Sequence, residues 1–253
     1  MAHEEIIRTV PGARYAVLMV HGILGSPDHF RDLTPLVPDT WTLHNIALEG
    51  HGGSVMDFAN TNMDRWRSQV FSKVEELLTN HEKIVIAAHS MGTLFALQAS
   101  LRWPDRIGGL FLLGSPTRVF VQPATAMHSV MLAFGYVDHN NRSFSDLAKE
   151  YSVRTTPWIF QYVLWIPRFL ELFAEIHRTR KIIPQITVPT QVFQSKHDEL
   201  VSFSSRHDFE NHPVIVLTNL YEKHSGHFGY GDADLALLQE RFSAMLHSVN
   251  IEG

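Results

Sequence analysis

The sequence has no cysteine among its 253 residues. It therefore contains no disulfide, no thiolate nucleophile and no cysteine-ligated metal site, and this absence is typical of a protein from a reducing compartment. The chain also has no excess of positive charge, because 21 Lys and Arg stand against 26 Asp and Glu and the net charge is −5. Without a basic stripe, the sequence predicts no nucleic-acid partner.

Long hydrophobic runs are missing too. The most apolar window, residues 158–173, is interrupted by Pro167, Arg168 and Glu171, whereas a membrane-spanning helix needs about 20 apolar residues. The first twelve residues carry acidic side chains where a signal peptide has basic ones. We therefore expect a cytoplasmic protein with no integral membrane segment. The apolar window is interpreted as a helix packed on its own domain, with transient contact to a lipid surface as the alternative.

Short apolar segments alternate with longer segments of helical period in the first and last parts of the chain. This alternation is typical of an α/β fold, a mostly parallel sheet covered by helices on both faces. The expected strands are residues 15–20, 41–46, 83–88, 109–113, 190–194 and 214–217, after a short antiparallel edge strand at 5–10. The expected helices are residues 26–37, which begin with Ser, Pro and Asp, and residues 64–80 and 232–249.

The alternation stops after residue 113 and resumes at residue 190. Residues 119–183 have helical period and hold 11 of the 27 aromatic residues of the chain. We interpret this segment as a helical cap inserted between two strands of one sheet. The predicted organisation is a core of residues 1–118 and 184–253 with a cap at 119–183.

Residues 84–97 carry the strongest local signal for catalysis. A buried strand runs through a tight turn directly into a helix, and Ser90 stands in the turn. A serine in this position is exposed above the sheet, with the amino end of a helix behind it. The turn needs small neighbours, here Ala88 and Gly92. The alternative is that Ser90 only caps the helix.

A serine hydroxyl needs a histidine to accept its proton and a carboxylate to orient that histidine. Asp198 follows the expected strand 190–194 and is the predicted acid, with its neighbour Glu199 as the competitor. His227 follows the expected strand 214–217 and is the predicted base, with His224 as the competitor. The two histidines as a zinc pair are the weaker interpretation, because no third ligand is evident.

The chemistry also needs amide donors for the oxyanion. The amide of Met91, directly after the nucleophile, is one predicted donor. The second is assigned to Ile23, because Gly22 lets the loop after the first parallel strand turn toward the site. His21 is predicted to hold this loop in place. The turn that contains His51 lies on the same rim, but its glycines are explained by turn geometry.

Together these motifs resemble the α/β-hydrolase superfamily over nearly the whole chain. They are His21-Gly22, Gly50-His51-Gly52 with Ser54, His89-Ser90-Met91-Gly92, Asp198 and His227, in the order of the family. Ala88 and Thr93 stand where glycines are common in its nucleophile motif. The chain is most similar to small bacterial carboxylesterases and monoacylglycerol lipases, in which a helical cap lies between the sixth and seventh strands. Haloalkane dehalogenases and epoxide hydrolases carry Asp at the nucleophile position, so Ser90 argues against both.

The resemblance implies a serine hydrolase that cleaves small to medium acyl carboxylic esters. Ser90 would attack the ester, His227 would carry the proton, Asp198 would orient His227, and the amides of Ile23 and Met91 would bind the oxyanion. The predicted partner is a small-molecule acyl ester. No metal and no cofactor is expected.

The aromatic cap offers candidate substrate-binding residues, although core packing is the other explanation for them. They are Phe120, Phe134, Trp158 and Trp165. The same triad would also serve a thioesterase, an acyltransferase or a carbon–carbon bond hydrolase, and the sequence does not separate these. A binding protein with little turnover is the alternative from another class.

Overall fold

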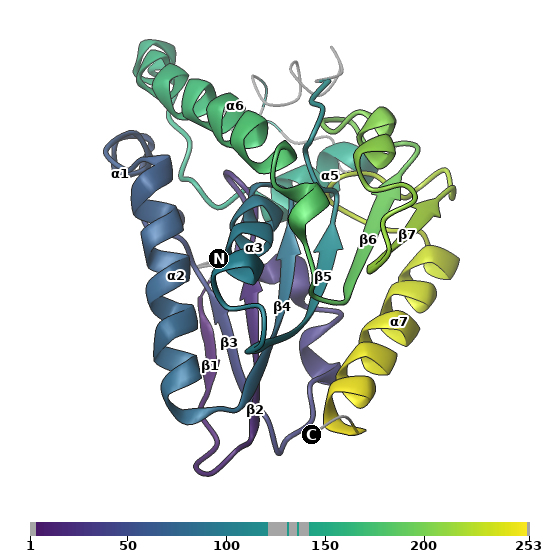
Figure 1. The fold of residues 1–253 in the computed structure, drawn as a ribbon. Helices are drawn as coiled ribbons and strands as arrows, with labels where there is room; N and C mark the ends of the chain where they lie inside the picture. Colours follow the sequence, from purple (N-terminus) through teal and green to yellow (C-terminus); the bar gives the residue numbers. More distant parts are fainter. Residues whose placement is uncertain (1–3, 121–130, 132–135, 137–141, 252–253) are drawn as a thin grey trace.

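A single mixed sheet forms the centre of the molecule (Figure 1). The computed structural model describes residues 4–120, 131, 136 and 142–251. The strands are β1 (Ile6–Arg8), β2 (Tyr15–Val20), β3 (Thr42–Ile46), β4 (Lys83–His89), β5 (Ile107–Leu113), β6 (Thr190–Ser195) and β7 (Ile215–Leu220). Their order across the sheet is β1-β3-β2-β4-β5-β6-β7. Among the described strands of this sheet, only the edge strand β1 pairs antiparallel. The predicted α/β fold is confirmed, and each expected strand is present.

Helices cover both faces of the sheet. They are α1 (Val55–Ala59), α2 (Met63–Asn80), α3 (Met91–Arg102), α5 (Arg142–Glu150), α6 (Ile166–Arg180) and α7 (Asp232–Ile251). Short 3-10 helices are η1 (Pro27–Phe30), η2 (Thr34–Leu36), η3 (Ile159–Trp165), η4 (Ile183–Gln185) and η5 (Phe203–Asp208). One apolar cluster joins the sheet to α2, α3 and α6, and a second joins the opposite face to η1 and α7. The strands are therefore apolar on both sides, as in a sheet buried between two helical layers.

One predicted helix was wrong and one observed helix was not predicted. The helix expected at residues 26–37 is instead the pair η1 and η2. Pro35, which has no amide hydrogen to donate, interrupts the helical hydrogen bonds there. Helix α1 was not predicted from the sequence, although Ser54 and Asp57 form a capping box at its start. The spacing of these two residues is the signal that would have revealed the helix.

The segment between β5 and β6 contains α5, η3, α6 and η4. This segment was expected between a sixth and a seventh strand. In the described chain it lies between the fifth strand, β5, and the sixth, β6, because a single strand, β1, comes before the first parallel strand, β2. Figure 1 shows α5 and α6 at the end of the molecule to which the arrowheads of β5 and β6 point. Buried Glu175 of α6 accepts hydrogen bonds from Arg67 of α2 at 3.1 Å and from Gln98 of α3 at 2.6 Å. This contact fixes α6 to the helical layer of the core.

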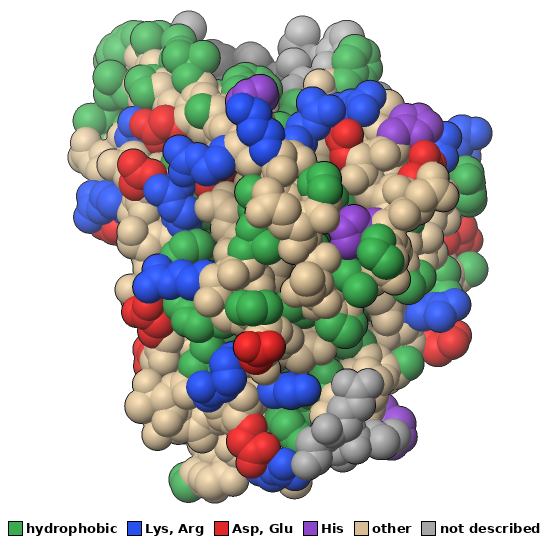
Figure 2. Space-filling view, viewed as in Figure 1, with side chains coloured by type: hydrophobic (Ala, Val, Ile, Leu, Met, Phe, Trp, Pro, Cys, Tyr) green, Lys and Arg blue, Asp and Glu red, His purple; other side chains and the backbone are tan. Residues whose placement is uncertain are grey.

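The apolar window 158–173 is only partly packed on the protein. Trp165 and Leu172 are buried in the core cluster. Seven other apolar side chains are 47–63% exposed: Trp158, Phe160, Val163, Leu164, Ile166, Leu170 and Phe173. Figure 2 shows apolar side chains gathered at the upper left, over α6. Among the described helices, none combines the length and the apolar character that crossing a membrane requires.

Candidate active site

Ser90 lies at the turn between β4 and α3, where the backbone is strained. Its φ of 51° is in the left-handed region, which a non-glycine residue rarely adopts. Its amide donates to the carbonyl of Leu113 at 2.9 Å, and its carbonyl accepts from the hydroxyl of Thr93 at 2.7 Å. Thr93 thus adds a hydrogen bond where a glycine is common. A Cβ at Gly92 would lie 2.3 Å from the carbonyl oxygen of Val20, so this close approach requires glycine.

Asp198 lies in the loop after β6 and is buried. Its Oδ1 accepts hydrogen bonds from the amides of Leu200 at 2.9 Å and Val201 at 2.6 Å. Its Oδ2 is 2.8 Å from Nδ1 of His227. The two amides fix the carboxylate, so one oxygen stays directed at the imidazole.

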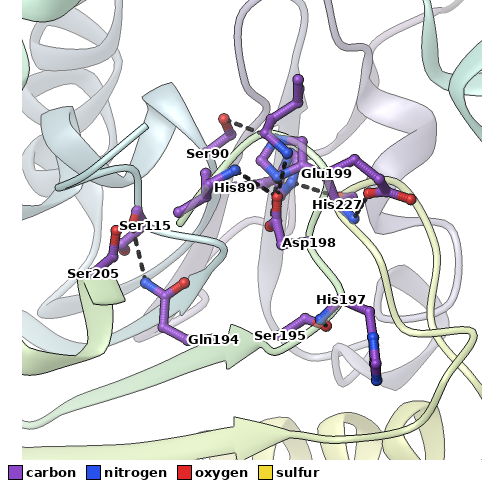
Figure 3. Close-up of polar contacts among 12 residues, drawn as sticks. His89, Ser90, Ser115, Gln194, Ser195, His197, Asp198, Glu199, Ser205 and His227 are labelled. Carbon is purple, nitrogen blue, oxygen red and sulfur yellow. Dashed lines mark hydrogen bonds and ion pairs between the residues drawn. The ribbon is translucent and has the colours of Figure 1, made fainter. Parts of the chain in front are cut away.

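His227 lies in the loop between β7 and α7 and joins the other two residues (Figure 3). Its Nε2 is 3.1 Å from Oγ of Ser90. Burial disfavours the charged ring, but the carboxylate of Asp198, the hydrogen bond from Nδ1 and the charge of Glu199 together outweigh it and raise the pKa of His227 above 6.5. The structure therefore brings together the three residues that the sequence analysis selected, in an arrangement suited to moving the proton of a serine.

The competing residues lie elsewhere. Oε2 of Glu199 accepts a hydrogen bond from the backbone amide of His227 at 2.7 Å. His224 is exposed on the surface. His197, next to Asp198, is also exposed, and Figure 3 shows its side chain pointing away from the site.

The loop after β2 lies against Ser90. A Cβ at Gly22 would be 2.6 Å from the Cβ of Ser90 and 3.2 Å from its Oγ. Ile23 is the next residue of this loop. Met91 is the first residue of α3, so its amide precedes the hydrogen-bonded ladder of the helix. Of the two predicted oxyanion donors, Met91 directly follows Ser90 and Ile23 directly follows Gly22. Their role stays a prediction.

Two histidines, buried His21 and partly buried His51, hold this loop. Nε2 of His21 accepts from the amide of Leu48 at 3.0 Å, so Nδ1 of His21 carries the hydrogen and donates to the carbonyl of Gly22 at 2.8 Å. Nε2 of His51 accepts from the amide of Leu24 at 3.1 Å. Burial, followed by the proximity of His21, lowers the pKa of His51 well below 6.5. His21 thus has the loop-holding contacts predicted for it, and His51 shares in them.

A stack of imidazoles lies beside the site and was not predicted from the sequence. His29 of η1 lies on His89 with ring centroids 3.6 Å apart and an interplanar angle of 17°. His89 in turn lies 4.6 Å from the ring of His227. Burial is the largest cause that lowers the pKa of both His29 and His89 well below 6.5, and the nearby imidazoles add to it. Both rings are therefore neutral, and no periodicity in the sequence places them together.

The predicted substrate-binding aromatics lie in different surroundings. Trp165 is buried; its Nε1 donates to the carbonyl of Val55 at 2.9 Å and its ring packs on Phe58. Phe120 and Trp158 are 62% and 60% exposed. Phe134 lies outside the described residues. Trp165 therefore has a packing role, and substrate contact by Phe120 and Trp158 stays a prediction.

Within the described residues there is no group of three or more acidic or histidine side chains arranged to hold a metal ion.

The chain matches a known family model and a known relative. The model of the Hydrolase_4 family, described as serine aminopeptidase, S33, matches residues 11–214. The chain is 24% identical over 200 residues to a carboxylesterase of Bacillus subtilis (strain 168), a match that covers 78% of this chain and 77% of the relative.

Solved structures share the fold. One described as representing LipS and LipT, two metagenome-derived lipolytic enzymes, has a TM-score of 0.73 at 22% identity and covers 98% of both chains. The monoacylglycerol lipase of Paleococcus ferrophilus has a TM-score of 0.67 at 17% identity and covers 96% of this chain and 98% of its own. At these identities the likeness concerns the fold.

Proposed function

This chain belongs to the Hydrolase_4 family (serine aminopeptidase, S33), an α/β-hydrolase family of the esterase and lipase kind, and we propose that it hydrolyses carboxylic esters through a covalent acyl-enzyme. One observation carries the proposal. The Oγ of Ser90, the two ring nitrogens of His227 and the carboxylate of Asp198 form a continuous chain of hydrogen bonds of 3.1 and 2.8 Å.

In the first half of the reaction, Ser90 Oγ attacks the ester carbonyl carbon while Nε2 of His227 takes the hydroxyl proton. The negative charge that forms on the carbonyl oxygen is bound by the amides of Ile23 and Met91. The tetrahedral intermediate then collapses, the bond to the alcohol oxygen breaks, and His227 returns the proton to the leaving alcohol. Asp198 stabilises the transient imidazolium.

In the second half, water replaces the alcohol. His227 takes a proton from the water as its oxygen attacks the acyl carbon. Collapse of the second intermediate breaks the bond to Ser90 Oγ, which regains a proton from His227, and the carboxylic acid leaves. The net reaction consumes one ester and one water and yields one acid and one alcohol.

We also propose that residues 119–183 act as a cap over this site, with residues 1–118 and 184–253 as the core. The described part of this segment touches both loops that border the nucleophile. The amide of Ser152 donates to the carbonyl of Leu24 at 3.0 Å, and Phe228, next to His227, packs against Phe144 and Leu147 of α5. For this capped site we propose a small to medium acyl ester as the substrate.

The exposed apolar side chains of η3 and α6 favour a second feature of this function. Trp158, Phe160 and other apolar side chains that are about half exposed or more form an apolar surface. Hydrolysis of a soluble ester does not require such a surface. We propose that this surface makes transient contact with aggregated or membrane-bound esters.

The experiment for the catalytic proposal is the hydrolysis of short- and medium-chain nitrophenyl esters by the native protein and by Ser90→Ala. The expected result is loss of at least about 1,000-fold in kcat/KM in the variant, since the nucleophile is gone. Ser68→Ala, at an exposed position of α2, is the matched control and retains native activity. Ester hydrolysis that survives Ser90→Ala would refute the proposal. Thioester and diketone substrates in the same assay separate ester hydrolysis from the other reactions of such a site.

A further inference from the structure

The backbone of His227 is held from both sides by side chains. Nε2 of His89 donates a hydrogen bond to the carbonyl oxygen of His227 at 3.0 Å. The amide of His227 donates to Oε2 of Glu199 at 2.7 Å. His89 directly precedes Ser90, and Glu199 directly follows Asp198. The base is therefore tied, through its own peptide groups, to the two chain segments that carry its side-chain partners.

The hydrogen bond from His89 defines the state of that ring. A carbonyl oxygen only accepts, so Nε2 of His89 carries a hydrogen. Burial, together with His29 and His227, lowers the pKa of His89 well below 6.5, so the ring is neutral. The stack with His29 at 3.6 Å fixes its plane. His89 is therefore a rigid, neutral donor in a single tautomer.

Glu199 reaches the loop of His227 because the preceding residue, Gly226, has no side chain. A Cβ at Gly226 would lie 2.5 Å from Oε1 and 2.7 Å from Oε2 of Glu199. Glycine at position 226 thus allows the carboxylate to approach the amide of the next residue. A hydrogen bond to a charged acceptor is stronger than one between neutral groups.

The rest of the loop has separate anchors. The hydroxyl of Ser225 donates to Oδ2 of Asp234 at 2.6 Å and accepts from the amide of Gly231 at 3.0 Å. The amide of Gly226 donates to the carbonyl of Gly229 at 2.9 Å. The loop is therefore closed on itself and fixed to α7 without His89 or Glu199. What these two residues add is control over the peptide groups of His227.

We propose that His89 and Glu199 are positioning residues that together form a backbone clamp on His227, holding its ring at once within reach of Ser90 and Asp198. The inference rests on the proposed function, in which His227 is the base. The clamp acts on the transition state, where the imidazole must bridge both partners, and it does not contact the substrate. Cutting it lowers kcat and leaves KM nearly unchanged.

Three variants separate the parts of the clamp. Glu199→Ala removes both the acceptor and the charge, while Glu199→Gln keeps an acceptor oxygen and removes only the charge. His89→Phe keeps an aromatic ring for the stack with His29 and removes the donor. The matched controls are His224→Gln and His197→Gln, which change exposed residues of the same two loops. Each protein is assayed for kcat, KM, the pH profile of kcat/KM and the temperature of unfolding.

We expect Glu199→Ala and His89→Phe to lose about 10- to 100-fold in kcat with KM within about twofold of native, because a displaced base loses its alignment. Glu199→Gln retains most of kcat. In this variant the acidic limb of the pH profile of kcat/KM moves to lower pH, because the loss of the Glu199 charge lowers the pKa of His227. The ionisable groups that then face His227 are Asp198 and the neutral rings of His29 and His89. The controls behave as native.

Two outcomes would overturn the clamp. One is native kcat in both Glu199→Ala and His89→Phe. The other is a fall in kcat that is accompanied in these variants by a comparable rise in KM and by a lower unfolding temperature. That is the pattern of a purely structural role.

A measurement that needs no turnover keeps this inference distinct from the proposed function. The proton on Nδ1 of His227, which faces Asp198 at 2.8 Å, gives a low-field NMR resonance in the resting protein. We expect this resonance to persist in Glu199→Gln and to broaden or vanish in Glu199→Ala and His89→Phe. If Ser90→Ala kept its activity, the proposed function would fail, but the resonance would still report whether the clamp holds His227. An unchanged resonance in all variants would refute the clamp by itself.

Discussion

Gly22 lies where a single methyl group would separate the proposed oxyanion loop from the nucleophile. The Cβ of Gly22→Ala would be 2.6 Å from the Cβ of Ser90, 3.2 Å from its Oγ and 3.4 Å from Nδ1 of His89. Nonbonded carbon atoms are comfortable at about 3.5 Å or more. A gap of about 1 Å must therefore open between the loop after β2 and Ser90.

Neither side of this contact moves easily without cost to the site. Ser90 is held by its hydrogen bonds to Leu113 and Thr93, and the loop is held by the bond between Leu24 and His51. A misplacement of about 1 Å among catalytic groups costs about 100-fold in rate, or about 2.7 kcal/mol of transition-state stabilisation. We expect kcat/KM of Gly22→Ala to fall by about this factor. Overpacking should lower the free energy of unfolding by about 1–3 kcal/mol.

The assay compares kcat/KM for a nitrophenyl ester with the free energy of unfolding. Gly12→Ala is the control, because Gly12 has a φ of +74° and nothing within 4 Å of the added Cβ. That change costs about 1–2 kcal/mol of stability through backbone strain, and kcat/KM stays native. A folded Gly22→Ala protein with kcat/KM within about threefold of native would refute the reasoning, since the same principle assigns about 100-fold to such a displacement.

Two further expectations concern pH and the physical state of the substrate. Because the reaction needs neutral His227 and its pKa is raised, kcat/KM should begin to fall on acidification at a pH above 6.5, as measured in a pH–rate profile; a limb centred below 6.5 would contradict this. His29 and His51 have lowered pKa values in the folded protein, so the stability they confer is present above the unfolded value of about 6.5 and is lost as the pH falls below it. Unfolding at pH 7.5 and 5.5 measures that loss, and equal stability at both would be the contrary result. Replacing Trp158 and Phe160 with Ser should reduce hydrolysis of emulsified esters several-fold more than hydrolysis of soluble ones, and equal effects would refute lipid contact.

Much of the fold was accessible from the sequence because burial on both faces makes each parallel strand a short apolar run. The triad candidates Ser90, Asp198 and His227 followed because each lies in the connection after such a strand. The helices near Pro35 and Ser54 were harder, since single residues decide their start and end. Local rules exist for both cases, a missing amide hydrogen and a capping box, but they act over a few residues and leave the apolar pattern unchanged.

The contacts around His227 were beyond prediction for a different reason. His89 and His227 are 138 positions apart, and the stack of His29 on His89 joins two segments that are not neighbours in the chain. Whether such rings meet depends on the register of β4 with β5 and of β6 with β7. The register of a strand depends on its partner strand and cannot be derived from its own composition. Sequence reasoning therefore finds residues whose role follows from their own strand and turn.

The role of Glu199 depends on both its position in the sequence and its contacts in the structure. Next to Asp198 and equally acidic, it competes for the role of the acid as long as only the sequence is considered. In the structure, the two amides of Leu200 and Val201 hold Asp198, leaving one oxygen for the imidazole, while Glu199 faces the amide of His227. The loop turns the two neighbouring carboxylates to different parts of one residue, the ring and the backbone. Asp198 and Glu199 therefore do not compete, and substitution of either one should disturb His227 by a different route.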